Sequence, residues 1–341
     1  MQQAGQSFRL VGSSQIPGAA KVAAGVINPV TGRWMTKSWR FDDFAPEAAR
    51  FYAEVGYRFS KRLYHPLPAV RFCLNAEDVK RAKRRSRNPR YGNVLGAYEE
   101  PESNRTIFNN SHGTFRIQEV AYVDLPLFIE TLRAYFQAGG RYQDQVFAHS
   151  RLEKTETGWS YAGHGYDRVV FCEGAALKEN PLFRNLPLKP AKGETLLCRS
   201  DGFELKKELT HHGKWLLPYP DGSFRIGATY DESDLSPDPT EAAKDELSEA
   251  FHAMTRGAHP LDVLDQPAGI RPSTSDARPF LGAHPTAPEL YVFNGLGSKG
   301  ASLAPTLSRE LLDFISGEKA LDPETDISRF FCGRPNNASC A

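Results

Sequence analysis

The residue types best suited to chemistry gather near the C-terminus, in a stretch that runs from an arginine to a glycine-rich turn. Arg271 follows Gly269 in the sequence Ala-Gly-Ile-Arg-Pro, and a short apolar strand is expected over 290–293. Glycines at 295, 297 and 300 come next, and a helix is expected from about residue 302. Loop N–H groups point outward, and a helix N-terminus favours negative charge. The stretch therefore predicts a cradle for an anionic ligand or cofactor, beside a guanidinium that can pair with a carboxylate.

A second stretch near the N-terminus is rich in small residues. The segment 19–29 holds Ala23, Ala24, Gly25 and Val26 in succession. Small side chains let a backbone pass close to a flat ring. The same residues also suit a plain tight loop, so this stretch alone leaves both interpretations open.

The order of these motifs is specific. Arg271 is followed by Asp276, by Pro279 and then by a Gly-x-Gly-x-x-Gly turn at 295–300. This order resembles the C-terminal signature of the D-amino-acid oxidase-like family of FAD-dependent amine oxidases, and the resemblance extends over most of 5–316. It implies an α/β fold (α+β, two domains), with an FAD/NAD(P)-binding Rossmann-like domain and an antiparallel-sheet substrate domain. It also implies FAD as the cofactor and a small amine or amino acid as the substrate.

The same resemblance implies domain boundaries. Residues 1–60, 124–180 and 265–320 would form the FAD-binding domain, and 61–123 and 181–264 the substrate domain. The last residues, 332–341, have turn formers without an apolar pattern and are expected to be a disordered tail. A chain of 341 residues is long enough for two such domains.

The resemblance also assigns roles to residues. The expected FAD contacts are Ala23, Ala24, Gly25, Val26, Val146, Gly174, Gly269, Gly295, Leu296, Gly297, Ser298, Lys299, Gly300 and Ala301. Arg271 and Trp215 are expected at the substrate, and no side chain is assigned as a catalyst, because the cofactor carries the electrons. In a member of this family a tyrosine faces the substrate where Trp215 stands, which predicts a different pocket here.

Each role has a structural alternative. Val146 could be an ordinary core valine, and Trp215 a core or sheet-face residue. Arg271 could form an ion pair with Asp276 or with a neighbour, while Asp276 itself fits a turn or capping residue better than a catalyst. Glu173, beside Gly174, replaces a residue that is usually small in the family.

The N-terminus departs from the family pattern. Ser7 to Val11 reads as a buried strand, and Gly12 and Ser13 stand where a ribose-binding acidic residue is expected. The first strand, its glycine-rich loop and its helix would precede this strand. Their absence predicts either an N-terminally incomplete product or a complete protein that has lost flavin binding.

The pattern of apolar and turn residues predicts the remaining elements. Helices are expected over 46–63, with Pro46 in the first turn, over 125–137, with Asp124 as N-cap, and over 241–256 and 303–315. The expected strands are 71–74, 106–108, 113–117, 120–123, 142–147 and 168–175, followed by a hairpin over 215–219 and 223–230. Residues 190–194 fit either a crossing strand or a turn between strands.

Bulk properties exclude several classes of protein. The net charge is +1, with 40% hydrophobic and 24% charged residues, so no global field favours nucleic acid or membrane. No run is long enough to span a membrane, and no signal-peptide core follows Met1. The five cysteines lack metal spacing, which with the missing signal indicates reduced thiols in the cytoplasm. A surface loop explains His211-His212 better than a metal site does.

Three hypotheses remain from the sequence. The first is an FAD-dependent oxidase of a small amine or amino acid, and the second is an oxidase that modifies a wobble uridine in tRNA. The second would use the basic cluster at 80–90, which a solvated helix face explains better because no aromatic residues interleave it. The third is a cofactor-free remnant. The oligomeric state is left open.

Overall fold

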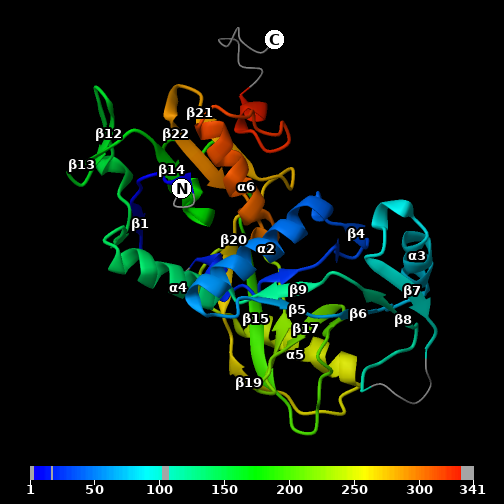
Figure 1. Cartoon of the computed structure of the whole chain (residues 1–341). Helices are drawn as coiled ribbons and strands as arrows, with labels where there is room; N and C mark the ends of the chain where they lie inside the picture. The colour runs from blue at the N-terminus through cyan, green and yellow to red at the C-terminus, as the bar shows by residue number, and fades with distance from the viewer. Residues whose placement is uncertain (1–3, 17, 102–106, 332–341) are drawn as a thin grey trace. The chain divides into compact units, whose positions relative to one another are not determined.

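A computed structural model of the chain describes residues 4–16, 18–101 and 107–331 (Figure 1). Its contacts divide the chain into two compact units. Unit 1 contains the described residues of Met1–Lys21, Phe128–Ala191 and Ile270–Ala341, and unit 2 those of Val22–Leu127 and Lys192–Gly269. The predicted domain boundaries follow expected cofactor contacts rather than compactness, so they stay a prediction. The predicted disordered tail at 332–341 lies outside the described residues, as do Cys332 and Cys340.

Unit 1 is built on a three-stranded sheet that leads into a helix. β14 (Val169–Phe171) pairs in parallel with β22 (Ala287–Asn294), and β21 (Phe280–His284) pairs antiparallel with β22. Phe171, Phe280 and Val292 belong to the apolar cluster on this sheet. α6 (Gly300–Ile315) follows β22, so the predicted strand and helix are both confirmed, although the helix begins two to three residues earlier.

A second parallel pair lies in the same unit. β1 (Leu10–Gly12) pairs with β10 (Tyr142–Asp144), and Leu10 lies opposite Tyr142. Both strands were predicted from apolar runs, and both are shorter than predicted. A small antiparallel sheet also belongs to unit 1 and contains β11 (Glu153–Thr155), β12 (Gly158–Tyr161) and β13 (His164–Tyr166).

Unit 2 contains the largest sheet. In spatial order its strands are β19 (Asp262–Asp265), β15 (Ala191–Arg199), β18 (Phe224–Gly227), β17 (Lys214–Pro218), β16 (Leu209–His212), β6 (Ala69–Phe72), β8 (Thr114–Ile117) and β7 (Leu95–Glu99), and β20 (Ala268–Arg271) also pairs with β15. Most neighbours are antiparallel, and β16 with β6 is a parallel pair. The smaller sheet of β2 (Val26–Ile27), β9 (Ala121–Val123) and β5 (Tyr64–Pro66) completes the strands around the predicted small-residue bend.

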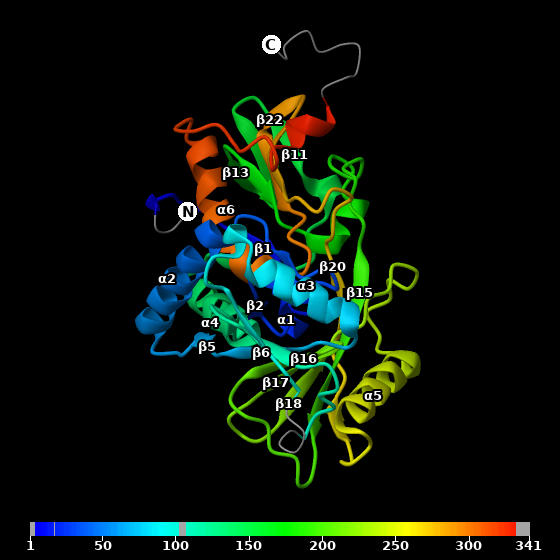
Figure 2. The ribbon, with the colours of Figure 1, turned by 90° about the vertical axis from the view of Figure 1, so that its right-hand side faces the viewer.

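The two faces of the large sheet differ in chemistry. On one face, Phe72, Leu216 and Phe224 pack with Leu247 and Phe251 of α5 (Glu241–Thr255). Figure 2 shows α5 next to the strands of this sheet. Successive residues of a strand point to opposite faces. The neighbouring residues Arg71, His211, Trp215 and Arg225 therefore belong to the other face. One face of the sheet is thus packed against an apolar core, and the other face carries a row of polar residues.

Several predicted elements are confirmed with small shifts. β17 and β18 form the predicted hairpin, α4 (Leu125–Ala138) has Asp124 accepting from the Leu127 N–H at 3.0 Å, and α5 follows its N-cap Thr240. The mixed α/β fold class is confirmed.

Two predictions about elements were wrong, one open alternative is decided, and one strand was not predicted. α2 (Phe41–Phe59) begins five residues before Pro46, so the proline lies in the second turn. Ile107 and Phe108 form a bend rather than a strand, and Thr106 lies outside the described residues. Residues 191–194 belong to a nine-residue strand, which rules out a turn there. β7 was missed, because its short run Leu-Gly-Ala-Tyr-Glu has little apolar alternation.

Candidate functional site

The glycine-rich turn of unit 1 joins β22 to α6 and depends on its glycines. Gly295 has φ +75° and Gly297 has φ +55°, both in the left-handed region. A Cβ on Gly295 would lie 2.7 Å from Thr274 Cγ2, so a larger residue would collide there. The turn is therefore shaped by the close passage of the 272–274 segment as well as by its own conformation.

Only part of the turn's hydrogen-bonding capacity is used by the protein. Gly295 N–H donates to Asn294 Oδ1 at 2.7 Å, and Lys299 N–H donates to Leu296 C=O at 3.0 Å. No acceptor among the described residues meets the N–H groups of four residues: Leu296, Ser298, Gly300 and Ala301. No side chain in the described part of the chain caps α6 either. The turn thus presents several free donors at a positive helix end.

Lys299 adds positive charge at the same place. Its side chain is half-buried at the N-cap of α6, and no described carboxylate lies within ion-pairing distance. Burial, and then the nearby Arg278 guanidinium, lowers the pKa of Lys299. A cation at the positive end of a helix is unfavourable without a counter-charge. The turn is therefore matched to an electron-rich or anionic ligand.

Arg271 ends β20, and the segment after it passes beside this turn. The next residue, Pro272, accepts a hydrogen bond from Gly297 N–H at 3.1 Å, which holds the arginine's segment against the turn. The side chain of Arg271 is half-buried and has contacts of its own. Asp276 accepts from Arg278 N–H at 3.0 Å and pairs with Arg329 at 3.0 Å, so it acts as a turn residue, as predicted.

Asn294 brings a third predicted segment to the turn. Its side chain is 3% exposed and donates from Nδ2 to Gly174 C=O at 3.0 Å. Gly174 has φ +58°, and a Cβ there would meet nothing within 4 Å. Glu173 is held away by His149 and Asn180, each at 2.7 Å. Asn294 was not among the predicted site residues, although an asparagine before a left-handed glycine is a typical turn signal.

Val146 lies elsewhere in unit 1. It follows β10, whose next residue Gln145 donates from N–H to Gly12 C=O at 3.0 Å. The side chain of Val146 is 61% exposed, so the alternative of an ordinary core valine is wrong. Its backbone contact with adenine stays a prediction.

The small-residue bend belongs to unit 2. Gly25 has φ +67°, and a Cβ there would lie 2.0 Å from Val123 C=O. Val26 pairs with Tyr122 of β9, and Arg225 donates to Val22 C=O at 2.9 Å. Gly25 is therefore required by the approach of the β9 backbone, whatever else the bend contacts. Gly269, also in unit 2, is buried within β20.

Trp215 lies in the middle of the large sheet. Its register partners are His211 of β16 and Gly227 of β18. A Cβ on Gly227 would lie 2.6 Å from Trp215 Cζ2, so the indole lies across that glycine. Trp215 is half-buried and is a sheet-face residue. Its contact with substrate stays a prediction.

The prediction of a surface loop at His211-His212 was wrong, because both residues belong to β16. His212 makes a 2.8 Å hydrogen bond with Asn109 C=O and lies beside Phe72. No group of three potential metal ligands exists among the described residues.

The basic cluster forms α3 (Ala76–Ser86) and is partly engaged by the protein. Arg81 is 8% exposed, pairs with Asp78 at 2.8 Å and stacks over Trp34 at 4.9 Å. Lys83 pairs with Glu100 at 3.3 Å. These contacts explain part of the cluster and do not favour the tRNA alternative. In the described parts of the chain, no helix has the length and apolarity needed to cross a membrane.

Comparisons with known proteins identify the relatives. Glycine oxidase from Pseudomonas aeruginosa is 29% identical over 221 residues, which cover 60% of this chain and 58% of that protein. The chain thus spans less than two thirds of this relative's length. The tRNA 5-methylaminomethyl-2-thiouridine biosynthesis bifunctional protein from Marinobacter nauticus is 32% identical over 158 residues, covering 43% of this chain and 25% of that protein.

The solved structures agree on the fold. Iminodiacetate oxidase from Chelativorans sp. BNC1 superposes with a TM-score of 0.78 at 19% identity, covering 95% of this chain and 94% of that one. At this identity the likeness shows the fold alone. The sequence profile of the family described as DAO, FAD dependent oxidoreductase, matches residues 2–313. The chain therefore belongs to the DAO family of FAD-dependent oxidoreductases, as the order of its arginine and glycine motifs predicted.

Proposed function

We propose that this chain uses FAD to oxidise a small amine or amino acid. The observation that carries the proposal is the turn at 294–301. Among the described residues, several of its N–H groups have no acceptor, no side chain caps the helix, and Lys299 has no carboxylate partner. Membership of an FAD-dependent family supplies the cofactor class. The printed names of the relatives supply glycine and iminodiacetate as the first substrates to test.

The residues at the turn fit FAD. The flavin ring carries carbonyl oxygens that accept hydrogen bonds, and its reduced form carries negative charge. The turn offers donors and a cation. The glycines at 295 and 297 keep side chains away from a ligand that approaches the backbone. We propose the predicted set as FAD contacts: Ala23–Val26, Val146, Gly174, Gly269 and Gly295–Ala301.

When bound, FAD would accept a hydride from the substrate carbon that carries the amine. The protein's part is to position the substrate and to exclude water. The Arg271 guanidinium is proposed to hold the substrate carboxylate bidentately. The free N–H groups and Lys299 would stabilise negative charge, because such donors are fixed before the reaction begins. Trp215 would contribute a flat apolar surface to the substrate pocket.

The proposal includes the predicted organisation of the chain. Residues 1–60, 124–180 and 265–320 would bind FAD, while 61–123 and 181–264 would face the substrate. The proposed compartment is the cytoplasm, because the spacing of the cysteines fits reduced thiols. A small amine or amino acid is the proposed partner.

The visible absorbance spectrum of the purified chain tests cofactor binding. Bands near ~370 and ~450 nm, retained on gel filtration after incubation with FAD, are the expected result. Turnover is then followed as hydrogen peroxide or ammonia released from glycine and iminodiacetate. A folded chain that retains no flavin from added FAD would contradict the proposal.

A pair of glycine variants makes this test specific. Gly297 and Gly317 both have positive φ, +55° and +78°, so alanine brings left-handed strain at either position. Gly297 lies in the turn, whereas Gly317 lies beyond the other end of α6. We expect Gly297→Ala to weaken flavin retention, while Gly317→Ala retains flavin like the wild type. Equal retention by both variants would mean that the turn does not hold the cofactor.

A further inference from the structure

The polar face of the unit 2 sheet carries a row of residues from neighbouring strands. By register, Arg71 of β6 lies beside His211 of β16, which lies beside Trp215 of β17. Neighbouring strands are ~4.8 Å apart, so Arg71 and Trp215 are ~10 Å apart with His211 between them. Paired residues in register point to the same face. The row therefore connects a guanidinium, an imidazole and an indole on one surface.

Arg71 is a buried cation that forms no ion pair with a described residue. Burial lowers the pKa of its guanidinium, and the Asp78 carboxylate opposes this shift only through space. The residue is 5% exposed, and its Nη2 donates to Gly32 C=O at 2.9 Å. Its Nη1 is buried and makes no hydrogen bond, and none of the described carboxylates forms an ion pair with it. Burying a charge that has no direct ion pair is unfavourable. An anion bound at Nη1 would therefore stabilise this side chain.

Arg81 provides the contrast within the same unit. It is 8% exposed and donates to Arg33 C=O at 3.2 Å, the residue after Gly32. Unlike Arg71, it has carboxylate partners: Asp78 at 2.8 Å and Glu77 at 3.6 Å. Both arginines therefore hold the same turn, and only Arg81 forms direct ion pairs with described residues. Holding the turn explains one donor of Arg71 and leaves its buried Nη1 group without a partner among the described residues.

His211 adds a second unused polar atom next to Arg71. Its Nδ1 is buried and makes no hydrogen bond. Burial, and then the Arg71 charge, lowers the pKa of His211 to about 3, so the imidazole is neutral near pH 7. A neutral imidazole can donate one hydrogen bond without adding charge. Two adjacent polar groups without a partner among the described residues, Arg71 Nη1 and His211 Nδ1, thus face the same side of the sheet.

Trp215 marks the solvent-accessible end of the row. Trp215 and His211 are each partly exposed, in contrast to Arg71. A ligand that lies over the indole would extend its far end across His211 toward the guanidinium. Arg71 Nη1 has no contact to lose when the side chain turns toward that ligand.

We propose that Arg71 and His211 form a subsite for an acidic group on the side chain of the substrate. This inference rests on the proposed function and deepens it. The preferred substrate would then be an amino acid with an acidic side group rather than one with an apolar side group. Arg71 would be a specificity-determining residue, because a carboxylate on its unused Nη1 group would form the direct ion pair that the described residues do not supply.

Thermal unfolding tests the subsite without turnover. Aspartate and alanine differ by one carboxylate, so they are compared at equal ionic strength, with acetate as a free anion, on the full flavin-loaded chain. Both enantiomers of each amino acid are tested. We expect at least one enantiomer of aspartate to raise the Tm more than alanine or acetate does. Arg71→Met should abolish this extra rise, and Arg81→Met should retain it. An equal rise with acetate would overturn the assignment to substrate.

Stability without ligand gives a second measurement. Arg71→Met removes an unpaired buried charge, so its Tm should equal or exceed that of the wild type. Arg81→Met breaks a buried ion pair, so its Tm should fall. If both variants lose stability equally, Arg71 is only a clamp on the turn and the proposal is overturned.

Steady-state kinetics complete the test. We expect Arg71→Met to lower kcat/KM for aspartate by about 30-fold or more, with little change for alanine. Arg71→Lys should recover part of the loss, because it restores the charge without the planar fork. An unchanged aspartate-to-alanine ratio would overturn the proposal. A chain that oxidises no amine would instead refute the oxidase function, while the thermal comparison would still decide whether the subsite binds an acidic group.

Discussion

At the scale of single residues, the candidate cofactor turn is held mainly by backbone groups. Gly297 N–H binds Pro272 C=O, and the Asn294 side chain links the start of the turn to Gly174. These bonds fix the path of the chain but leave donors at 296, 298, 300 and 301 unused. A side chain could not replace this arrangement, since a Cβ at Gly295 would strike Thr274. Positioned backbone donors need no reorganisation when charge develops nearby.

Replacing Lys299 should change the flavin's reduction potential. The half-buried cation has no described counter-charge, so it would favour the reduced, negatively charged flavin. We expect Lys299→Met to lower the two-electron potential by about 30 mV or more, which corresponds to ~1.4 kcal/mol. Dye-coupled reductive titration measures this potential. Lys299→Arg retains the charge and serves as control, and a potential that stays the same in Lys299→Met would contradict the role.

Replacing Arg271 should weaken substrate binding more than it slows turnover. A guanidinium that pairs with the substrate carboxylate acts in the ground state and in the transition state alike. We expect Arg271→Ala to raise KM for an amino acid by about 100-fold, with a smaller change in kcat. An amine without a carboxylate is the matched control substrate, and its KM should not respond. Equal KM values for wild type and variant on the amino acid would remove the anchor role.

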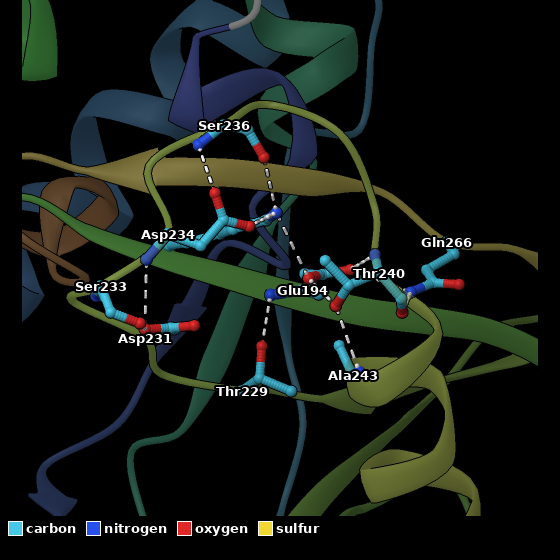
Figure 3. Close-up of polar contacts among 10 residues, drawn as sticks. Glu194, Thr229, Asp231, Ser233, Asp234, Ser236, Thr240, Ala243 and Gln266 are labelled. Carbon is cyan, nitrogen blue, oxygen red and sulfur yellow. Dashed lines mark hydrogen bonds and ion pairs between the residues drawn. The ribbon is translucent and has the colours of Figure 1, made fainter.

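At the scale of elements, one buried polar cluster ties β15 to the start of α5. Glu194 is 2% exposed and accepts hydrogen bonds from Thr240 N–H and Gln266 Nε2, both at 2.9 Å (Figure 3). Lys192 is 1% exposed and pairs with Asp234 at 2.5 Å and with Glu194 at 3.7 Å. The cluster fixes the 231–240 segment on β15 and satisfies the N-terminus of the helix that covers the apolar face.

Neutralising Glu194 should destabilise unit 2. Glu194→Gln removes a negative charge from a buried pair and also replaces an acceptor oxygen with a donor beside the Thr240 N–H. Breaking a buried, hydrogen-bonded charge pair costs about 3–5 kcal/mol. We expect a loss of this order in the free energy of urea unfolding. Glu241→Gln is the control, because its carboxylate is 74% exposed in a pair with Lys244. A loss no larger than the control's would show that the cluster is not a stabilising feature.

Local signals explain which elements could be predicted from the sequence. Asp124, the Asp221-Gly222 hairpin turn and the glycines at 295–300 each act within a few residues, so the ends of α4, β17 and β22 were readable. The row of Arg71, His211 and Trp215 could not be predicted, because His211 and Arg71 are joined only by strand pairing across 140 positions. Without knowledge of this strand pairing, two adjacent histidines predict a surface loop.

At the scale of the whole molecule, both compact units are assembled from segments far apart in the chain. Unit 1 pairs β1 with β10, and unit 2 pairs β6 with β16, each across more than a hundred residues. Long-range pairing of this kind depends on the burial of side chains that no local propensity identifies. Titration of a buried group in one such pair should therefore affect the stability of the fold that contains it.

Acid should destabilise the protein through His211. The pKa of His211 is lowered from 6.5 to about 3 in the folded chain, so the unfolded chain binds a proton between these values and the folded chain does not. Stability therefore rises with pH across that window and is lost as pH falls, by at most ~1.4 kcal/mol per pH unit for one group. We expect His211→Asn to reduce the loss between pH 7 and pH 4.5, measured by urea unfolding followed through tryptophan fluorescence. His212→Asn, on the opposite face of β16, should retain the wild-type loss. If His211→Asn leaves the slope unchanged, the imidazole is protonated in the fold, and the row beside Arg71 carries two cations instead of one.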